Sequence, residues 1–276
     1  MSEQTGGSRW RAAGIGMVVP ALVIALWQFV AMRGWVSPQA LPSPLAVLEK
    51  WWAYLLPLQP FDGQGSYIKW MFSGELIEDT IGSMYRVLAG FVVGGGLALP
   101  LGLLMGANPR VYAWFNPLVQ LVRPIPPIAY IPLSMLWFGL GNPPAIFLIA
   151  LGAFFPVLMN TIAGVRHVDG IYLRAARNLG AGGYTMFVRV ILPASVPYIL
   201  SGVRIGIGTA FIVVIVAEMI AVNNGLGYRI SEAREYFWSD KIIAGMISIG
   251  LIGLAIDVGM NKLNNYLLRW HRGLEN

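Results

Sequence analysis

The sequence predicts an all-α protein that crosses a membrane six times. Of its 276 residues, 57% are hydrophobic and only 12% are charged, whereas soluble proteins have about 45–50% and about 25%. Uncharged stretches long enough to span a bilayer recur along the chain. The sequence contains no cysteine, which excludes disulfide scaffolds, thiolate metal sites and cysteine catalysis.

Residues 14–32 are the first predicted transmembrane helix. This stretch carries no charge and lies between Arg11 and Arg33. A signal peptide is the alternative, but its apolar region is usually about 7–15 residues long, and no small-x-small cleavage site follows here. We therefore expect a retained helix, preceded by residues 1–13 as a cytoplasmic N-terminus.

Residues 33–80 are predicted to be a periplasmic connection that contains a short interfacial helix. Prolines, glycines and charges interrupt this stretch. Ser43 followed by Pro44 has the chemistry of a helix start, because serine caps the first turn and proline is tolerated within it. The apolar residues that follow fall on one helix face: Leu45, Leu48, Trp52 and Leu55.

Residues 81–265 are expected to hold the other five spans, followed by a cytoplasmic tail over 266–276. In the second span, small residues recur at every fourth position, which lets a neighbouring helix approach closely: Gly90, Gly94, Ala98, Gly102 and Gly106. Residues 124–165 are uncharged and too long for one span, so we predict two helices separated by the Gly139–Pro144 turn. The first begins near Val111 or later and runs to about Phe138 through several prolines, which must distort it.

The last two spans are predicted at Val196–Val222 and Ile242–Leu263, and Gly202 and Gly206 in the former have packing spacing. With the N-terminus inside, the inner segments carry ten basic and three acidic residues, and the outer segments carry six and eight. Basic residues collect at cytoplasmic ends, so both termini are expected in the cytoplasm. This topology explains the net charge of +6, and no basic run with interleaved aromatic residues indicates nucleic-acid binding.

Residues for enzymatic chemistry are missing. None of the four lysines lies in a G-x-x-x-x-G-K-[ST] pattern, so the chain has no loop of this kind to bind a nucleotide. His167 and His271 fall in predicted cytoplasmic segments, away from any intramembrane metal site. We expect a non-catalytic membrane subunit with no metal or cofactor of its own.

The longest internal cytoplasmic loop, residues 166–194, contains a predicted amphipathic helix. Arg174, Arg177 and Asn178 lie opposite its apolar face, and Gly180 allows the backbone to turn afterwards. The helix either rests on the membrane surface or docks into a groove of a partner protein. The apolar face comprises Val168, Ile171, Tyr172, Ala175, Ala176 and Leu179.

This loop resembles that of ATP-binding-cassette (ABC) importer permeases, whose pattern is Glu-Ala-Ala, three residues, Gly, nine residues and Ile-x-Leu-Pro. The matching residues are Ala175, Ala176, Gly180, Leu192 and Pro193, with Val190 for the isoleucine and Arg174 for the glutamate. Other segments are similar to the nitrate/sulfonate/taurine branch of these permeases: Leu41–Pro44, Arg123–Pro127, Trp137–Gly141, Gly202–Gly206, Ala217–Met219 and Gly225–Tyr228. Together the matches span residues 41–273.

The resemblance implies the fold of type I ABC importer permeases and an assembly in the bacterial inner membrane. Two copies of this chain would work with two ATPase subunits, which bind ATP and Mg, and with a periplasmic substrate-binding protein. Closure of the ATPase pair would move the loop and switch the spans between outward and inward access. The residues implied in ATPase coupling are Ile171, Tyr172, Arg174, Ala175, Ala176, Leu179, Gly180, Leu192 and Pro193. The departure at Arg174 affects any polar contact that the glutamate makes.

The branch transports small anions, and the ending Leu268–His271 looks like that of taurine permeases. The resemblance therefore favours taurine or another alkyl sulfonate, with nitrate and bicarbonate as alternatives. An ion-gradient-driven secondary transporter is the rival hypothesis, and it requires paired ionisable residues near mid-membrane. A membrane scaffold, which needs no transport pathway, is a third.

Three charged residues are candidates for the translocation pathway or a gate: Arg123, Arg204 and Glu218. A guanidinium suits sulfonate or carboxylate oxygens, but arginines near the cytoplasmic boundary also bind helix-end carbonyls or phosphate headgroups. Arg204 and Glu218 are about 21 Å apart along one helix, so each needs another partner. Glu218 is expected to be a gate or packing contact, because a carboxylate repels an anion.

Overall fold

The structure is a computed structural model that describes residues 6–57, 61 and 66–269. His271 and most of the predicted tail, residues 266–276, lie outside these ranges. The described residues fold into helices and contain no strand. The elements are α1 (Gly6–Met32), α2 (Pro44–Leu55), α3 (Tyr67–Met71), α4 (Glu75–Ala107), α5 (Pro109–Val122), the 3-10 helix η1 (Pro127–Tyr130), α6 (Ile131–Phe138), α7 (Asn142–Arg166), α8 (Gly170–Asn178), α9 (Gly183–Met186), the π-helix η2 (Phe187–Ile191), α10 (Leu192–Ala221), α11 (Leu226–Glu235) and α12 (Ser239–Leu267).

The chain divides into two compact units. One comprises Met1–Ile77 and Ile230–Ser248, and the other comprises Glu78–Arg229 and Ile249–Asn276. Three helices, α4, α11 and α12, run from one unit into the other. We name these the smaller and the larger unit.

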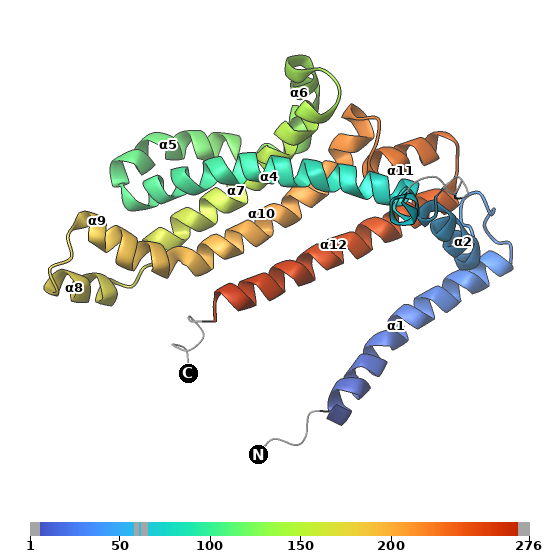
Figure 1. Cartoon of the computed structure of the whole chain (residues 1–276), viewed down its shortest axis with the longest axis horizontal. Coiled ribbons are helices and arrows are strands. Elements are labelled where there is room, and N and C mark those ends of the chain that lie inside the picture. The colour runs from blue at the N-terminus through green and yellow to red at the C-terminus, as the bar shows by residue number, and fades with distance from the viewer. Residues whose placement is uncertain (1–5, 58–60, 62–65, 270–276) are drawn as a thin grey trace. The chain divides into compact units, whose positions relative to one another are not determined.

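The helix pair α7 and α10 forms the centre of the larger unit (Figure 1). Of the apolar part of α7, 56% is buried, against 33% or less in the other long helices. Gly202 and Gly206 of α10 face α7, where added Cβ atoms would lie 2.7 Å from Asn160 and 3.0 Å from Val157. Larger side chains would separate the two helices, so the predicted packing role of these glycines is confirmed.

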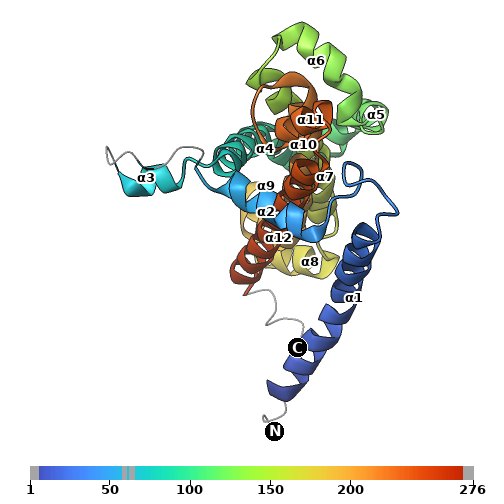
Figure 2. The same cartoon turned by 90° about the vertical axis from the view of Figure 1, so that its right-hand side faces the viewer.

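The small-residue ridge of α4 packs against α7. A Cβ atom added at Gly90 would lie 2.5 Å from Ile149, and one at Gly102 would lie 2.7 Å from Thr161. Ala98, between them, is fully buried. The repeat in the sequence therefore predicted the helix contact correctly, and Figure 2 shows α4 and α7 in the view turned by 90°.

The proline-rich helix is broken rather than merely distorted. The segments Pro109–Val122 and Pro127–Phe138 meet at an angle of 83°. Pro126 and Pro127 lack the N–H that a continuous helix needs, so the chain turns between α5 and the following 3-10 turn. The first segment starts slightly earlier than expected, because the Asn108 side chain caps it by accepting a hydrogen bond from the Arg110 N–H (2.9 Å).

The fifth span also begins earlier than predicted. The sequence placed its start near Val196, but the helical segment runs from Gly183 to Ala221. Residues 166–194 were expected to form a cytoplasmic loop, because this stretch is polar and basic. A π turn precedes Pro193, in which the Leu192 N–H bonds to the Phe187 carbonyl, and the helix continues through this turn into α10.

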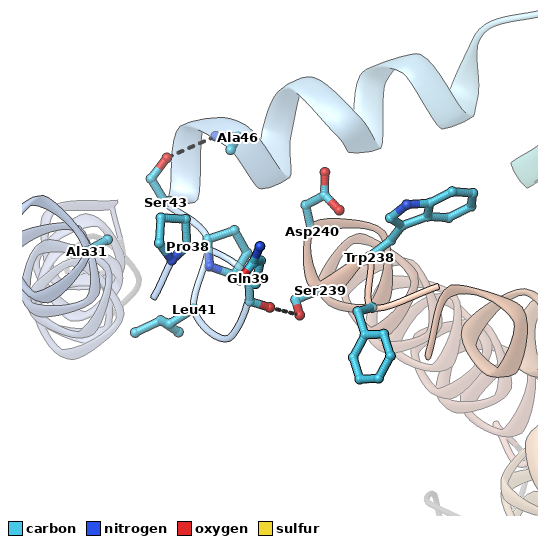
Figure 3. A pocket seen from close by; sticks show the side chains of 11 residues that line it. Ala31, Pro38, Gln39, Leu41, Ser43, Ala46, Trp238, Ser239 and Asp240 are labelled. Atoms are coloured by element: carbon cyan, nitrogen blue, oxygen red, sulfur yellow. Dashed lines mark hydrogen bonds between the residues drawn. The ribbon is translucent and has the colours of Figure 1, made fainter. Parts of the chain in front are cut away.

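In the smaller unit, the predicted short helix is confirmed as α2. The Ser43 hydroxyl accepts a hydrogen bond from the Ala46 N–H (3.2 Å), as a capping residue should. The same turn lines a pocket of about 440 Å³ together with residues 237–240. Figure 3 shows this pocket and the bond from the Ser239 hydroxyl to the Gln39 carbonyl.

Among the described residues, four helical segments are long and apolar enough to cross a membrane, or five if the bent α5–α6 pair is one span. The four are Glu75–Ala107, Asn142–Arg166, Gly183–Ala221 and Ser239–Leu267. The apolar part of α1, Gly16–Met32, is shorter. Five of the six predicted spans correspond to these segments when the bent pair counts as one span, and the first predicted span, residues 14–32, stays a prediction.

Candidate functional site

The helix α8 and the turn after it form the first candidate site. The Asp169 carboxylate caps the helix by accepting the Ile171 N–H (2.8 Å). Gly180 ends it with a φ of +82°, a conformation that residues with a side chain rarely adopt. The next residue, Ala181, donates its N–H to the Ala176 carbonyl (3.0 Å), which completes a Schellman cap. The predicted helix and its glycine turn are thus confirmed.

The apolar face of α8 is exposed. The exposed fractions are 60% for Ile171 and 88% for Leu179, and Tyr172 is similarly open. An apolar patch of this kind indicates a docking surface or a membrane contact. Of the predicted coupling residues, Ile171 to Gly180 lie in this helix and its cap, whereas Leu192 and Pro193 lie beyond the π turn at the start of α10. Figure 1 shows α8 and α9 at one end of the α7–α10 pair.

Arg123 lies at the second candidate site, a pocket of about 370 Å³ beside the break between α5 and α6. The other polar residues that line it are Asn160 of α7 and Thr209 of α10, and the remaining walls are apolar. The Arg123 side chain is exposed, and no ion pair involves it within the described part of the chain. A guanidinium without an acidic partner in an apolar cavity is suited to bind an anion.

Arg204 forms an ion pair with Asp257 of α12. Its Nη2 atom lies 2.8 Å from Asp257 Oδ1 and its Nε lies 3.1 Å from the same oxygen. The two side chains are 41% and 52% exposed. The expectation that Arg204 and Glu218 have different partners is confirmed, and the partner of Arg204 within the described residues is the Asp257 carboxylate. The anion and headgroup interpretations of Arg204 stay predictions.

Glu218 is fully buried and forms an ion pair with Arg86 of α4. Arg86 Nη1 lies 2.6 Å from Glu218 Oε1, and the Ser83 hydroxyl donates to Glu218 Oε2 at 2.9 Å. The guanidinium also donates to Asn142 Oδ1 through Nε (2.7 Å), and to the carbonyl and side-chain oxygens of Asn224. The pair therefore links α4 to α7, to α10 and to the α10–α11 turn.

The same group of side chains caps the first turn of α11. The Gly225 N–H donates to Asp79 Oδ1 (2.9 Å), the Leu226 N–H to Ser83 Oγ (3.0 Å) and the Gly227 N–H to Glu218 Oε2 (3.0 Å). Anionic and hydroxyl acceptors stabilise a helix N-terminus because its first N–H groups have no partner within the helix. Asp79, Ser83, Arg86 and Glu218 are buried, whereas their partners Asn142 and Asn224 are exposed. We name these six residues the buried polar cluster after its buried centre.

The buried polar cluster explains the Gly225-Leu-Gly-Tyr228 motif. Gly225 has a φ of +111°, and a Cβ atom there would lie 2.5 Å from the Glu218 carboxyl carbon. A Cβ atom at Gly227 would overlap the Ile215 carbonyl. Both glycines are needed because the turn lies directly against the Glu218 side chain and its helix.

Sequence reasoning placed Arg86 only at the edge of a span and did not pair it with Glu218. A signal was present: a charge in or near an apolar span needs a partner, and Arg86 and Glu218 have opposite sign. Asp79, Ser83, Asn142 and Asn224 were missed as well, because their positions give no indication of which helices meet. Among the described residues, no group of three His, Cys, Asp or Glu side chains is arranged to bind a metal ion.

Comparison with known proteins agrees with this architecture. Residues 98–272 match the family described as the binding-protein-dependent transport system inner membrane component. The chain is 41% identical to a putative ABC transporter permease of Methanocaldococcus jannaschii, with 92% of this chain and 91% of the relative covered. It is 36% identical to the putative aliphatic sulfonates transport permease SsuC of Bacillus subtilis (94% and 88% covered) and 34% identical to the taurine transport system permease TauC of Escherichia coli (95% and 93% covered).

The fold is also that of a solved structure. An inward-facing structure of the MetNI methionine ABC transporter superposes with a TM-score of 0.62 at 17% identity, covering 73% of this chain and 99% of that one. The chain therefore belongs to the family of inner membrane components of binding-protein-dependent transport systems, the permeases of ABC importers.

Proposed function

We propose that this chain is the permease subunit through which an ATP-driven importer moves a small organic sulfonate from the periplasm to the cytoplasm. The observation that carries the proposal is the α8 segment, an amphipathic helix whose apolar face is exposed and whose end is fixed by Gly180. Such a helix fits a groove in an ATPase subunit. Alternating access then follows from movement of α8 relative to the spans.

The chemistry of ATP hydrolysis belongs to partner chains in this proposal. The sequence has no Walker A loop, so the chain is non-catalytic, and ATP and Mg bind to two ATPase subunits. A second copy of the permease and a periplasmic substrate-binding protein complete the assembly. The distribution of basic residues supports an inner-membrane topology with both termini in the cytoplasm.

Taurine or another alkyl sulfonate is the favoured substrate, because the names of two relatives specify taurine and aliphatic sulfonates. A bicarbonate permease at 33% identity keeps other small anions, including nitrate, as alternatives. Arg123 is proposed to attract the anion, since its guanidinium lines an otherwise apolar pocket. Arg204, paired with Asp257, is proposed as a second pathway residue, and Glu218 as part of a gate.

Family membership disfavours the rival hypothesis of an ion-gradient-driven secondary transporter, although Arg86 and Glu218 form the kind of buried charge pair that such transporters use. The decisive experiment is uptake of taurine into proteoliposomes that contain the permease and its ATPase, with binding protein added outside. Uptake that requires ATP inside and no ion gradient supports the importer. Uptake driven by an ion gradient without the ATPase contradicts it.

Two substitutions test the role of α8. Gly180→Val is expected to lower ATP-driven uptake at least tenfold, because φ +82° strains a branched residue. Ala176→Asp is expected to do the same by placing a charge in the apolar face. Gly182→Val is the matched control, because Gly182 has a φ of −83° and, like Gly180, open space around its Cβ position.

Asn178→Asp is the control for charge, since Asn178 lies on the polar face and is exposed. Both controls should transport at the wild-type rate. Normal uptake by Gly180→Val and Ala176→Asp would show that α8 is only a surface helix. The measurements are uptake, ATPase rate and recovery of the assembled complex.

A further inference from the structure

The buried polar cluster has more hydrogen bonds than a simple ion pair requires. The side chain of Arg86 is 3% exposed and that of Glu218 is fully buried. Four donor bonds from the guanidinium reach three separate parts of the larger unit, namely Asn142, Glu218 and Asn224. Because a buried charge pair is weak evidence for stability, this arrangement points to a role in fixing geometry.

The three segments that Arg86 joins are the start of α7, the end of α10 and the α10–α11 turn. Asn142 opens α7 after the α6–α7 turn, and Asn224 lies in the α10–α11 turn. The α6–α7 turn is also joined directly to the end of α10, since the Gly141 N–H donates to the Ala221 carbonyl at 2.7 Å. The cluster therefore holds both turns and the end of α10 against α4.

The cluster lies at the end of α10 that is opposite to α8. The helical segment that starts at Gly183, just after α8, continues to Ala221. Glu218 follows Gly183 by thirty-five residues, about 52 Å along a helix. Figure 1 shows α8 and α9 at one end of α10 and the α10–α11 turn at the other. One helical segment, with a π turn at Phe187–Ile191, thus connects the proposed ATPase contact to the cluster.

From this arrangement we infer that Arg86, Ser83 and Asn142 are positioning residues of transport, which make the end of α10, the α10–α11 turn and α4 move as one body. The inference rests on the proposed function, because the movement begins at α8. Arg86 and Ser83 are too deeply buried to meet a solute, so they act through Glu218 and the turn. Without them, α10 would move while the turn stayed behind, and the two ends of the bundle would lose their coupling.

The test uses the full complex in proteoliposomes and three variants. Arg86→Gln removes the ion pair, and Ser83→Ala removes two hydrogen bonds of the cluster without a large change in volume. The matched control is Ser134→Ala, because Ser134 is equally buried but its hydroxyl bonds only to the Ile131 carbonyl of the preceding turn. Each variant is assayed for assembly, for basal and binding-protein-stimulated ATPase activity, and for uptake.

We expect Ser83→Ala and Arg86→Gln to assemble and keep basal ATPase activity while uptake falls at least fivefold and tenfold, respectively. Ser134→Ala should match the wild type. If Arg86→Gln fails to assemble, the double variant Arg86→Met/Glu218→Gln removes both buried charges and restores assembly, yet it should still transport poorly. Wild-type uptake by Ser83→Ala or by the assembled double variant overturns the inference.

A distance measurement distinguishes a positioning role of the cluster from a general loss of stability in the variants. The chain has no cysteine, so spin labels can be placed at Gly96→Cys on α4 and Asn223→Cys in the turn, both exposed sites. The distribution of distances between the two labels should be narrow in the wild type, with and without ATP. It should be broader in Ser83→Ala. A narrow distribution in Ser83→Ala contradicts the inference. Absence of ATP-driven uptake in the wild type would instead contradict the proposed function.

Discussion

At the scale of single residues, one buried pair of charges makes Arg86 and Glu218 depend on each other. Glu218 Oε1 lies 2.6 Å from Arg86 Nη1, and the two side chains are 0% and 3% exposed. Attraction between such charges offsets the cost of removing them from water only while both are present. Each residue therefore depends on the other more than on any apolar neighbour.

A double-mutant cycle measures this dependence. Glu218→Ala should lower the free energy of unfolding by about 3–5 kcal/mol, because it leaves the Arg86 guanidinium buried and unpaired. Adding Arg86→Met should restore part of the loss, so that the two effects are far from additive. Equilibrium unfolding in mixed micelles, followed by circular dichroism, gives the four values. Additive effects would show that the two side chains do not interact.

At the same scale, the sequence predicted backbone geometry better than it predicted partners. The left-handed turn at Gly180 followed from a glycine placed after an amphipathic helix, because the local chain alone determines φ. The partner of Arg86 did not follow, because Glu218 is distant in the sequence. Local geometry is encoded by neighbouring residues, whereas a buried ion pair depends on how two helices are rotated.

At the scale of elements, helix packing depends on which face of α4 carries its small residues. Gly94 faces α7, where an added Cβ atom would overlap the Ala150 carbonyl. Gly96 lies two residues later on the same helix and has no neighbouring atom within 4 Å of its Cβ position. The two glycines have the same intrinsic helix propensity, but Gly94 is packed against another helix and Gly96 is not.

Substituting valine at each position separates packing from helix propensity. Gly94→Val should lower the free energy of unfolding by about 1–3 kcal/mol or more, because α4 must move away from α7. Gly96→Val should change it by less than about 0.5 kcal/mol. Unfolding in mixed micelles measures both. Equal destabilisation by the two variants would show that the ridge is not the contact surface.

For the whole molecule, the charge distribution predicts sidedness that cysteine labelling can test. The sequence has no cysteine, so a single introduced thiol reports its own position. Gly182→Cys, after α8, should react with a membrane-impermeant maleimide only in inverted vesicles, and Asn223→Cys only in intact cells whose outer membrane is permeabilised. Labelling of both sites from the same side would contradict the six-span topology.

The sequence by itself determined the helical class, the approximate position of most spans, the α4 ridge, a distortion of the proline-rich helix and the glycine turn after α8. Each of these follows from residues close together in the chain, through hydropathy, periodicity or a required backbone conformation. Only the tertiary structure decided that Arg86 pairs with Glu218, that Arg204 pairs with Asp257 and that Arg123 lines a cavity. These contacts depend on how each helix is rotated about its axis and on which helices lie next to it. A span that is hydrophobic on every side specifies neither its rotation nor its neighbours.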